Sequence, residues 1–298
     1  MTPATGNIFQ RLTTPADGRW LAAYRIGLGF VIFLSAQRRL IPFLGNSDQP
    51  VIHAKVFLPV YLVDFVDAHL GFVRILLCIL ALLFSAGLFT RVVTPLLAIV
   101  HLVVYAFVYQ NFDAPIPWFY EWPLLFILIW AKPAEHWSAD ALISKLRNKR
   151  TPATYSLNYR WPLEAATAWF AMIYVWAAIA KFVPISDGLS WLDGGAIRHI
   201  MYIRYLDSPS CWLFGTPLFD YTGNLWAFTL LAVIAIVTEF SAILLLVTTR
   251  AHFLVIAAIL GMHVFLVYIG VFGFLEHAVV LSIPVIGTMR YRKAKPSH

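Results

Sequence analysis

The chain has 298 residues, of which 60% are hydrophobic and only 12% are charged, and its mean hydropathy is +0.75. An ordinary soluble domain has about 25% charged residues and about 45–50% apolar residues. The composition therefore indicates a polytopic membrane protein and excludes soluble dinucleotide-binding, barrel and nucleic-acid-binding classes. The formal net charge of +7 does not require a nucleic-acid partner, because Lys and Arg collect on the cytoplasmic loops of membrane proteins.

Eight apolar stretches follow one another along the chain and are candidates for membrane-spanning helices, which need about 20 residues. They are residues 20–36, 72–89, 92–109, 118–131, 163–183, 225–248, 252–272 and 274–289. We therefore expect an all-α membrane bundle of about eight transmembrane helices that forms one domain over residues 1–298, with no soluble C-terminal domain. The fourth and eighth stretches are short, so a tilted or re-entrant arrangement stays open for both.

The distribution of basic residues predicts the orientation of this bundle. With the N-terminus in the cytoplasm, fourteen of the 22 Lys and Arg residues lie on the cytoplasmic side and six on the outer side. This bias predicts that both termini are cytoplasmic. The outer side then has two long connections, roughly 37–71 and 184–224, and we expect the functional face there. In the second connection, Asp193 is predicted to cap a short amphipathic helix that contains Ile197, Ile200 and Met201.

Ionisable side chains inside apolar stretches need a reason, because each costs roughly 2.5–3.5 kcal/mol at the bilayer centre. The candidates are Arg25, His101, Glu121, Lys181, Glu239, His263, Glu276 and His277. Lys181 is predicted either to extend to the lipid headgroups or to face the bundle interior, where desolvation would make it a usable base. Tyr174 lies seven residues earlier, on the same face of the helix.

The other ionisable residues each have two interpretations. Glu239 is either a structural partner of Arg25 or of a histidine, or a functional carboxylate. His263 and His101 are each either hydrogen-bonded core residues or site residues. Arg25 is expected to reach the headgroups or to form an ion pair between helices, and Glu121 is expected to begin a helix, where an acidic side chain is favoured.

The sequence contains no HExxH, CxxC, CxxCH, GxSxG, P-loop or GxGxxG motif. We therefore expect no metal centre and no soluble-enzyme site of these types. The two cysteines, Cys78 and Cys211, are too few for a thiolate metal cage. Aromatic residues make up 16% of the chain. Their clusters at 118–122 and 169–176 belong either to an ordinary interfacial belt or to a site for a flat ring such as a quinone.

Several stretches together resemble one membrane-protein family. They are LAAYRIGLGF, YQNFDAPIPWFYEWPLLFILIWAKP, HWSADAL, WFAMIYVWAAIAKFVPISDGLSWLDGGAI and GMHVFLVYIGVFGF. In this order they are similar to the HTTM family, the membrane domain of vitamin K-dependent γ-carboxylase-like proteins. The most specific segment places Lys181 a short distance before Trp191, Asp193 and the following glycines. The carboxylase has an additional large soluble domain, so its mode of propeptide recognition is not implied here.

The resemblance implies a function for these residues. Lys181 would be the base that deprotonates reduced vitamin K or another quinol, and Glu239 and His263 would be polar groups of the same cavity. The remaining residues expected to bind the substrate are Trp191, Asp193, Tyr174, Glu121, Trp122 and His101. The implied reaction is oxygen-dependent quinol oxidation or epoxidation, either alone or coupled to carboxylation, in a bacterial inner-membrane enzyme of lyase or oxidoreductase type.

Two other functions stay open at this point. The first is a non-enzymatic membrane partner that helps to mature or export a secreted peptide. The second is a transporter, although the sequence has no pair of Gly- or Pro-interrupted helices in equivalent halves. The expected partners are the lipid bilayer, a quinone or lipid-like small molecule and a peptide substrate.

Overall fold

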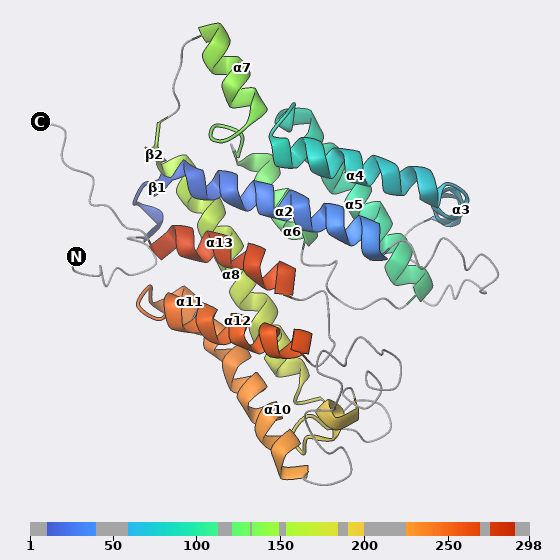
Figure 1. Ribbon diagram of the computed structural model, residues 1–298, viewed down its shortest axis with the longest axis vertical. Coiled ribbons are helices and arrows are strands. Elements are labelled where there is room, and N and C mark those ends of the chain that lie inside the picture. The colour runs from blue at the N-terminus through green and yellow to red at the C-terminus, as the bar shows by residue number, and fades with distance from the viewer. Residues whose placement is uncertain are drawn as a thin grey trace, which may run out of the picture. The chain divides into compact units, whose positions relative to one another are not determined.

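The computed structural model describes most of the chain and shows it to be mostly helical (Figure 1). The described residues are 11–39, 59–112, 121–131, 133–148, 153–183, 190–199, 225–268 and 275–289. The expected all-α class is thus confirmed in its main feature, apart from two strands of two residues each. The predicted helix residues Ile200 and Met201, Cys211 and most of the aromatic cluster at 118–122 lie outside the described residues.

The chain divides into two compact units, and the division falls within helix α8 (Leu157–Ala180). The N-terminal unit contains Leu12–Ala166 together with Arg290–His298. The C-terminal unit contains Thr167–Met289 together with Met1–Arg11. The expectation of a single domain stays a prediction, and each unit is described by itself.

The N-terminal unit is a layer of helices that pack along one another. Its elements are β1 (Ala16–Asp17), α2 (Gly18–Arg39), α3 (Val60–Ala68), α4 (Leu70–Ala86), α5 (Thr90–Phe112), α6 (Glu121–Trp130), α7 (Ala139–Asn148), β2 (Tyr155–Ser156) and the first part of α8. Helix α2 packs against α4, α4 against α5, and α5 against α6 (Figure 1). The approach of α2 to α4 requires a glycine at position 29, because a Cβ atom there would lie 2.2 Å from Ser85 Oγ.

The C-terminal unit contains the rest of α8 and the last helices of the chain. These are α10 (Leu225–Phe240), the short 3₁₀ turn η5 (Ser241–Ile243), α11 (Leu244–Val247), α12 (His252–Tyr268) and α13 (Leu275–Met289). Helix α12 packs against both α10 and α13. The elements α10, η5 and α11 follow one another directly, so that one apolar stretch continues from Trp226 to Val247.

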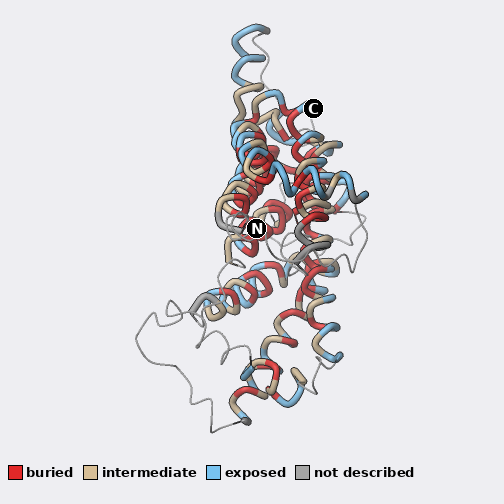
Figure 2. Tube along the Cα trace, turned by 90° about the vertical axis from the view of Figure 1, so that its right-hand side faces the viewer, coloured by how far each residue is buried: buried red, intermediate tan, exposed pale blue. Residues whose placement is uncertain are grey.

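Several helices are apolar on their outer face as well as on their inner face. On α4, Leu77 and Phe84 are buried, whereas Ile75 and Ile79 are each at least half exposed. Figure 2 shows the same alternation of buried and exposed residues along the helices. A helix that is hydrophobic all round belongs in a large core or in a membrane. The exposed apolar faces therefore support a membrane protein.

Four helical stretches among the described residues are long and apolar enough to cross a membrane, judged by length and composition. They are Gly18–Gln37, Thr90–Phe107, Leu157–Ala180 and Trp226–Val247. Shorter apolar helices, Leu70–Ala86, Glu121–Trp130, His252–Leu266 and Leu275–Met289, cover the other four stretches that the sequence indicated. Each predicted stretch is thus helical over most of its described residues, but the number of eight crossings stays a prediction.

Arg25 corrects one expectation from the sequence. Its side chain is fully buried, so it does not extend to a surface, and its hydrogen-bond partners among the described residues are not carboxylates. The guanidinium instead donates hydrogen bonds to three backbone carbonyl oxygens, those of Pro133 (2.7 Å), Trp137 (2.6 Å) and Ser85 (3.3 Å). The planar guanidinium has five N–H donors, which allows it to bind several separate carbonyls at once. Arg25 thereby joins α2 to the end of α4 and to the segment before α7.

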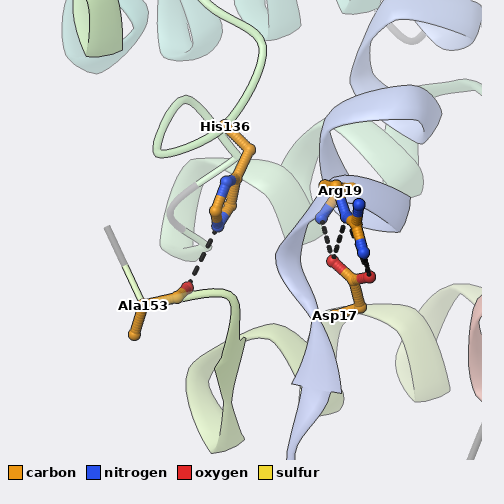
Figure 3. A network of polar contacts seen from close by, with 4 residues as sticks. All are labelled: Asp17, Arg19, His136 and Ala153. Atoms are coloured by element: carbon orange, nitrogen blue, oxygen red, sulfur yellow. Dashed lines mark hydrogen bonds and ion pairs between the residues drawn. The ribbon is translucent and has the colours of Figure 1, made fainter. Parts of the chain in front are cut away.

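A small polar network surrounds the two short strands, which pair antiparallel (Figure 3). The carboxylate of Asp17 accepts hydrogen bonds from the Arg19 side chain at 2.7–3.1 Å and from the Arg19 backbone N–H at 2.9 Å. Close by, the His136 ring lies 3.1 Å from the Ala153 carbonyl oxygen through its Nε2 atom. The strand pairing, together with the Gly18 N–H that donates to the Thr154 carbonyl oxygen at 3.0 Å, fastens the start of α2 to the start of α8.

The carboxylate of Asp140, on α7, caps the first turn of α5 from outside that helix. Its two oxygens accept hydrogen bonds from the backbone N–H groups of Phe89 (2.8 Å) and Thr90 (2.9 Å) and from the Thr90 hydroxyl (2.8 Å). Partial burial raises the pKa of Asp140, but these hydrogen bonds and the Arg25 charge outweigh it, so that the pKa lies below its ordinary value. The native structure therefore favours the ionised carboxylate.

The Asp140 cap predicts a pH-dependent contribution to stability. Because the folded-state pKa lies below the unfolded value of about 3.9, the contribution is complete above that pH and is lost as the pH falls through the folded-state pKa. We expect Asp140→Ala to lower the free energy of unfolding by about 1 kcal/mol at pH 7 and by less at pH 3. Unfolding in detergent at both pH values measures this, with the exposed Asp64→Ala as control. An equal loss at both values would contradict the prediction.

Candidate functional site

An ion pair joins the end of α8 to the end of α10 within the C-terminal unit. Lys181 directly follows α8, and its Nζ atom lies 2.7 Å and 2.6 Å from the two carboxylate oxygens of Glu239. The two side chains are only 13% and 8% exposed. Nζ also donates a hydrogen bond to the Ala177 carbonyl oxygen at 3.3 Å. Of the two sequence interpretations, the interior orientation of Lys181 is therefore correct, and the partner of Glu239 is neither Arg25 nor a histidine.

Aromatic rings flank the ion pair. The centroid of the Trp191 ring lies 4.9 Å from Lys181 Nζ, which is within the range of a cation–π interaction. Phe182 and Phe240 are the chain neighbours of the two charged residues, and their ring centroids lie 6.0 Å apart. The positive charge is thus held between a carboxylate and an indole. The indole offers a flat apolar surface beside a group that can exchange a proton.

The position of Trp191 is set by a turn that is attached to α10. The Thr229 hydroxyl donates a hydrogen bond to the Asp193 carbonyl oxygen at 2.7 Å. Gly194 has φ +81°, and a Cβ atom there would lie 2.4 Å from the Thr229 backbone nitrogen. Only glycine adopts this backbone conformation readily and also fits so close to the α10 backbone. The turn that carries Trp191 is therefore held directly against α10.

Asp193 has a structural role in the same turn. Its carboxylate accepts a hydrogen bond from the Gly195 backbone N–H at 2.8 Å, and residues 195–199 are helical. A helix begins at the predicted place, but its first helical hydrogen bond, from the Arg198 N–H at 3.0 Å, goes to the Gly194 carbonyl oxygen. Asp193 therefore lies one residue before the cap position, and its carboxylate bonds to the first residue of the helix. Its predicted contact with a substrate stays a prediction.

Tyr174 and His263 form a second buried contact in the C-terminal unit. The Tyr174 hydroxyl, on α8, lies 2.7 Å from Nε2 of His263, on α12, and both residues are buried. Tyr174 precedes Lys181 by two helical turns, which corresponds to roughly 10 Å along α8. His277, on α13, is also buried. The polar groups of this unit therefore come from four helices.

The three remaining predicted site residues lie in the N-terminal unit. His101 Nε2, on α5, lies 2.6 Å from the carboxylate of Glu121, the first residue of α6, and the Ser35 hydroxyl donates to the same carboxylate at 3.4 Å. Glu121 thus begins a helix, as expected.

Trp122 is half-buried and stacks on Phe126 with ring centroids 6.0 Å apart. The sequence grouped these residues with Lys181, whereas they form their own cluster in a different unit.

A pocket that no sequence motif indicated lies elsewhere in the N-terminal unit. Its volume is about 810 Å³, and it is lined by the start of α5, the end of α6, one side of α7 and residues 153–159. Its polar residues include Asp140, which already caps α5, and Glu135, which accepts a hydrogen bond from the Tyr159 hydroxyl. Because the lining comes from four separate segments, only the packed structure brings it together.

Within the described ranges, no three His, Cys, Asp or Glu side chains are grouped so that they could hold a metal ion. No family model, no curated protein and no solved structure matches the chain. The geometry of the two polar clusters is therefore what points to a function.

The Lys181–Glu239 pair predicts strong energetic coupling between its two residues. Removal of one partner leaves a desolvated charge and costs about 3 kcal/mol, whereas replacement of both by apolar residues costs much less. We therefore expect Lys181→Met and Glu239→Leu each to be strongly destabilising, and the double variant to recover more than half of the summed loss. Unfolding curves in mixed micelles measure this double-mutant cycle.

The pair of Asp17 and Arg19 serves as the control cycle, in which less coupling is expected because the Arg19 side chain is half exposed and solvent screens its charge. Additive losses at Lys181 and Glu239 would show that the two side chains do not depend on each other.

Proposed function

We propose that this chain is an integral membrane enzyme of the carboxylase-like HTTM type, which binds a quinol in the C-terminal unit and uses Lys181 as its base. The observation that supports this most is the Lys181–Glu239 pair beneath the Trp191 ring. A lysine inside an apolar unit, paired with a carboxylate and covered by an aromatic ring, is unusual for a purely structural residue. An intramembrane ionisable residue is a functional candidate by default.

The pair can supply the basic form of the lysine without a change in its total charge. When the shared proton resides on Glu239 rather than on Nζ, both groups are neutral. A neutral amine is the form that accepts a proton from a hydroquinone hydroxyl. The hydrogen bonds of 2.6 Å and 2.7 Å provide the path for this exchange. Glu239 would therefore hold the lysine proton while the neutral amine accepts a proton from the quinol.

The surroundings of the pair suit a quinol in shape and polarity. The Trp191 ring offers a flat apolar surface next to Nζ, and such surfaces stack on aromatic rings. In the carboxylase chemistry, the bound quinol would react with oxygen and supply the strong base needed for carboxylation. The protein's own part is to hold the ring, to accept the hydroxyl proton at Lys181 and to exclude water.

We further propose that the chain crosses a bacterial inner membrane eight times, with both termini in the cytoplasm. The bias of basic residues and the eight apolar helices support this topology. Lys181 would then lie near the outer face. We expect a fluorescent reporter fused to either terminus to be active in the cytoplasm and alkaline phosphatase fused there to be inactive. The opposite pattern at one terminus would mean an odd number of crossings.

The quinol proposal predicts that the protein copurifies with a quinone that depends on Lys181. We expect extraction and mass spectrometry to find a quinone or its epoxide with the wild type, and to find less of it, or an altered form, with Lys181→Ala. Oxygen-dependent oxidation of a reduced quinone should fall by about 10²–10⁴-fold, which is the usual contribution of a general base. Lys145→Ala, on the exposed face of α7, is the matched lysine control.

Only bulk phospholipid in both preparations, together with unchanged oxidation, would contradict the proposal. Copurification of a peptide instead of a quinone would favour the alternative, in which the protein helps to mature or export that peptide.

A further inference from the structure

The His101–Glu121 pair of the N-terminal unit has one ring nitrogen, His101 Nδ1, whose role packing does not explain. Both side chains are at most 2% exposed, and the pair is joined through His101 Nε2 at 2.6 Å. In the part of the chain that the structure describes, no protein group bonds to the other ring nitrogen, His101 Nδ1. A buried polar atom without a partner is rare in proteins. The Nδ1 atom therefore needs an explanation beyond packing.

His252 shows what a structural histidine looks like in this protein. Its Nε2 atom lies 2.9 Å from the Leu245 carbonyl oxygen, and its Nδ1 atom lies 3.5 Å from the Thr288 hydroxyl. Both ring nitrogens thus have partners within the chain, and the ring is fully buried. His101 differs because only one of its nitrogens is used.

The carboxylate determines which chemistry the free nitrogen of His101 can perform. An ionised Glu121 has only acceptor atoms, so His101 must donate its Nε2–H to it. In the neutral imidazole the Nδ1 atom then carries a lone pair and accepts hydrogen bonds. This is the arrangement in which a carboxylate holds an imidazole in one tautomer so that the other nitrogen can accept a proton. The dyad is therefore an acceptor site.

The surroundings limit the kind of molecule that such a site accepts. The residues one turn away on the same helix faces, Leu97, Val104 and Leu125, are fully buried and apolar. The charge of Glu121 behind the ring disfavours an anion. The described residues offer no third ligand for a metal ion. A neutral apolar molecule with one hydroxyl donor satisfies all of these conditions.

We infer that His101 and Glu121 form a second binding site, in which Nδ1 accepts a hydrogen bond from the hydroxyl group of a neutral, lipid-soluble alcohol or phenol. The site lies in the N-terminal unit and does not rest on the role proposed for Lys181. Glu121 is the positioning residue that fixes the tautomer, and His101 is the residue that contacts the hydroxyl. Ser35 supports the orientation of the carboxylate.

The test uses nitrogen NMR of the full chain with ¹⁵N-labelled histidine in lipid nanodiscs. The His101 signals are identified by their loss in His101→Gln. We expect His101 to be protonated at Nε2 and unprotonated at Nδ1 in the wild type. Added p-cresol should shift the Nδ1 signal, whereas p-xylene, in which a methyl group replaces the hydroxyl so that no donor remains, should leave it unchanged. This measurement on the wild type does not depend on the folding of a variant.

Two variants separate the positioning role of Glu121 from a general effect on structure. Glu121→Gln keeps an acceptor oxygen but removes the charge, and we expect it to weaken p-cresol binding by about tenfold, because a hydrogen bond to a charged group is roughly twice as strong as a neutral one. Glu164→Gln removes another buried carboxylate of the same unit, paired with Arg160, and should leave the shift unchanged. Lys181→Met should also leave it unchanged, which separates this site from the proposed quinol site.

A proton on Nδ1 instead of Nε2 would overturn the inference. The same conclusion would follow if both probes or neither of them moved the Nδ1 signal, since water or nonspecific partitioning would then account for the nitrogen.

Discussion

A polar group placed among apolar helices needs a partner that the protein or a bound molecule supplies, because lipid offers none. This constraint governs the interior of both units. Arg25 meets it with three backbone carbonyls, and Lys181 meets it with one carboxylate and one aromatic ring. Arg25 stays charged and holds the end of α4 and the segment before α7 together. Lys181 has a proton that it can share with its carboxylate partner. The same constraint thus produces a fixed contact between segments in one unit and a pair capable of proton exchange in the other.

The partners of these buried charged residues also show which features of the structure could be predicted from the sequence and which could not. Apolar stretches have a strong local signature, so the eight helices were predicted at nearly the right places, and the ionisable residues inside them were identified. The partner of Lys181 was not, because Glu239 lies 58 positions away and is brought close only by the packing of α8 and α10. Carbonyl acceptors such as those around Arg25 have no side-chain signature at all. Helices α3 and α7 were missed because they are short and lie in stretches that read as connections.

The two polar clusters differ in the number of partners that each group has. In the C-terminal unit, Lys181 is in contact with a carboxylate, a carbonyl and an indole, so any ligand would compete with these contacts. In the N-terminal unit, the bond between His101 and Glu121 uses one ring nitrogen and leaves the other as an acceptor. A ligand there would add a contact without displacing one. The clusters are therefore suited to different events: exchange of a proton in the first, and retention of a hydroxyl compound in the second.

The docking of Gly194 on α10 has a mechanical consequence for the lysine site. The turn that carries Trp191 is attached to the first half of α10, and Glu239 stands on the last turn of the same helix. Both side-chain partners of Lys181 are therefore fixed to one helix, whereas Lys181 itself follows the end of α8. A displacement of the end of α8 away from α10 by a few ångströms would break the ion pair and the indole contact together.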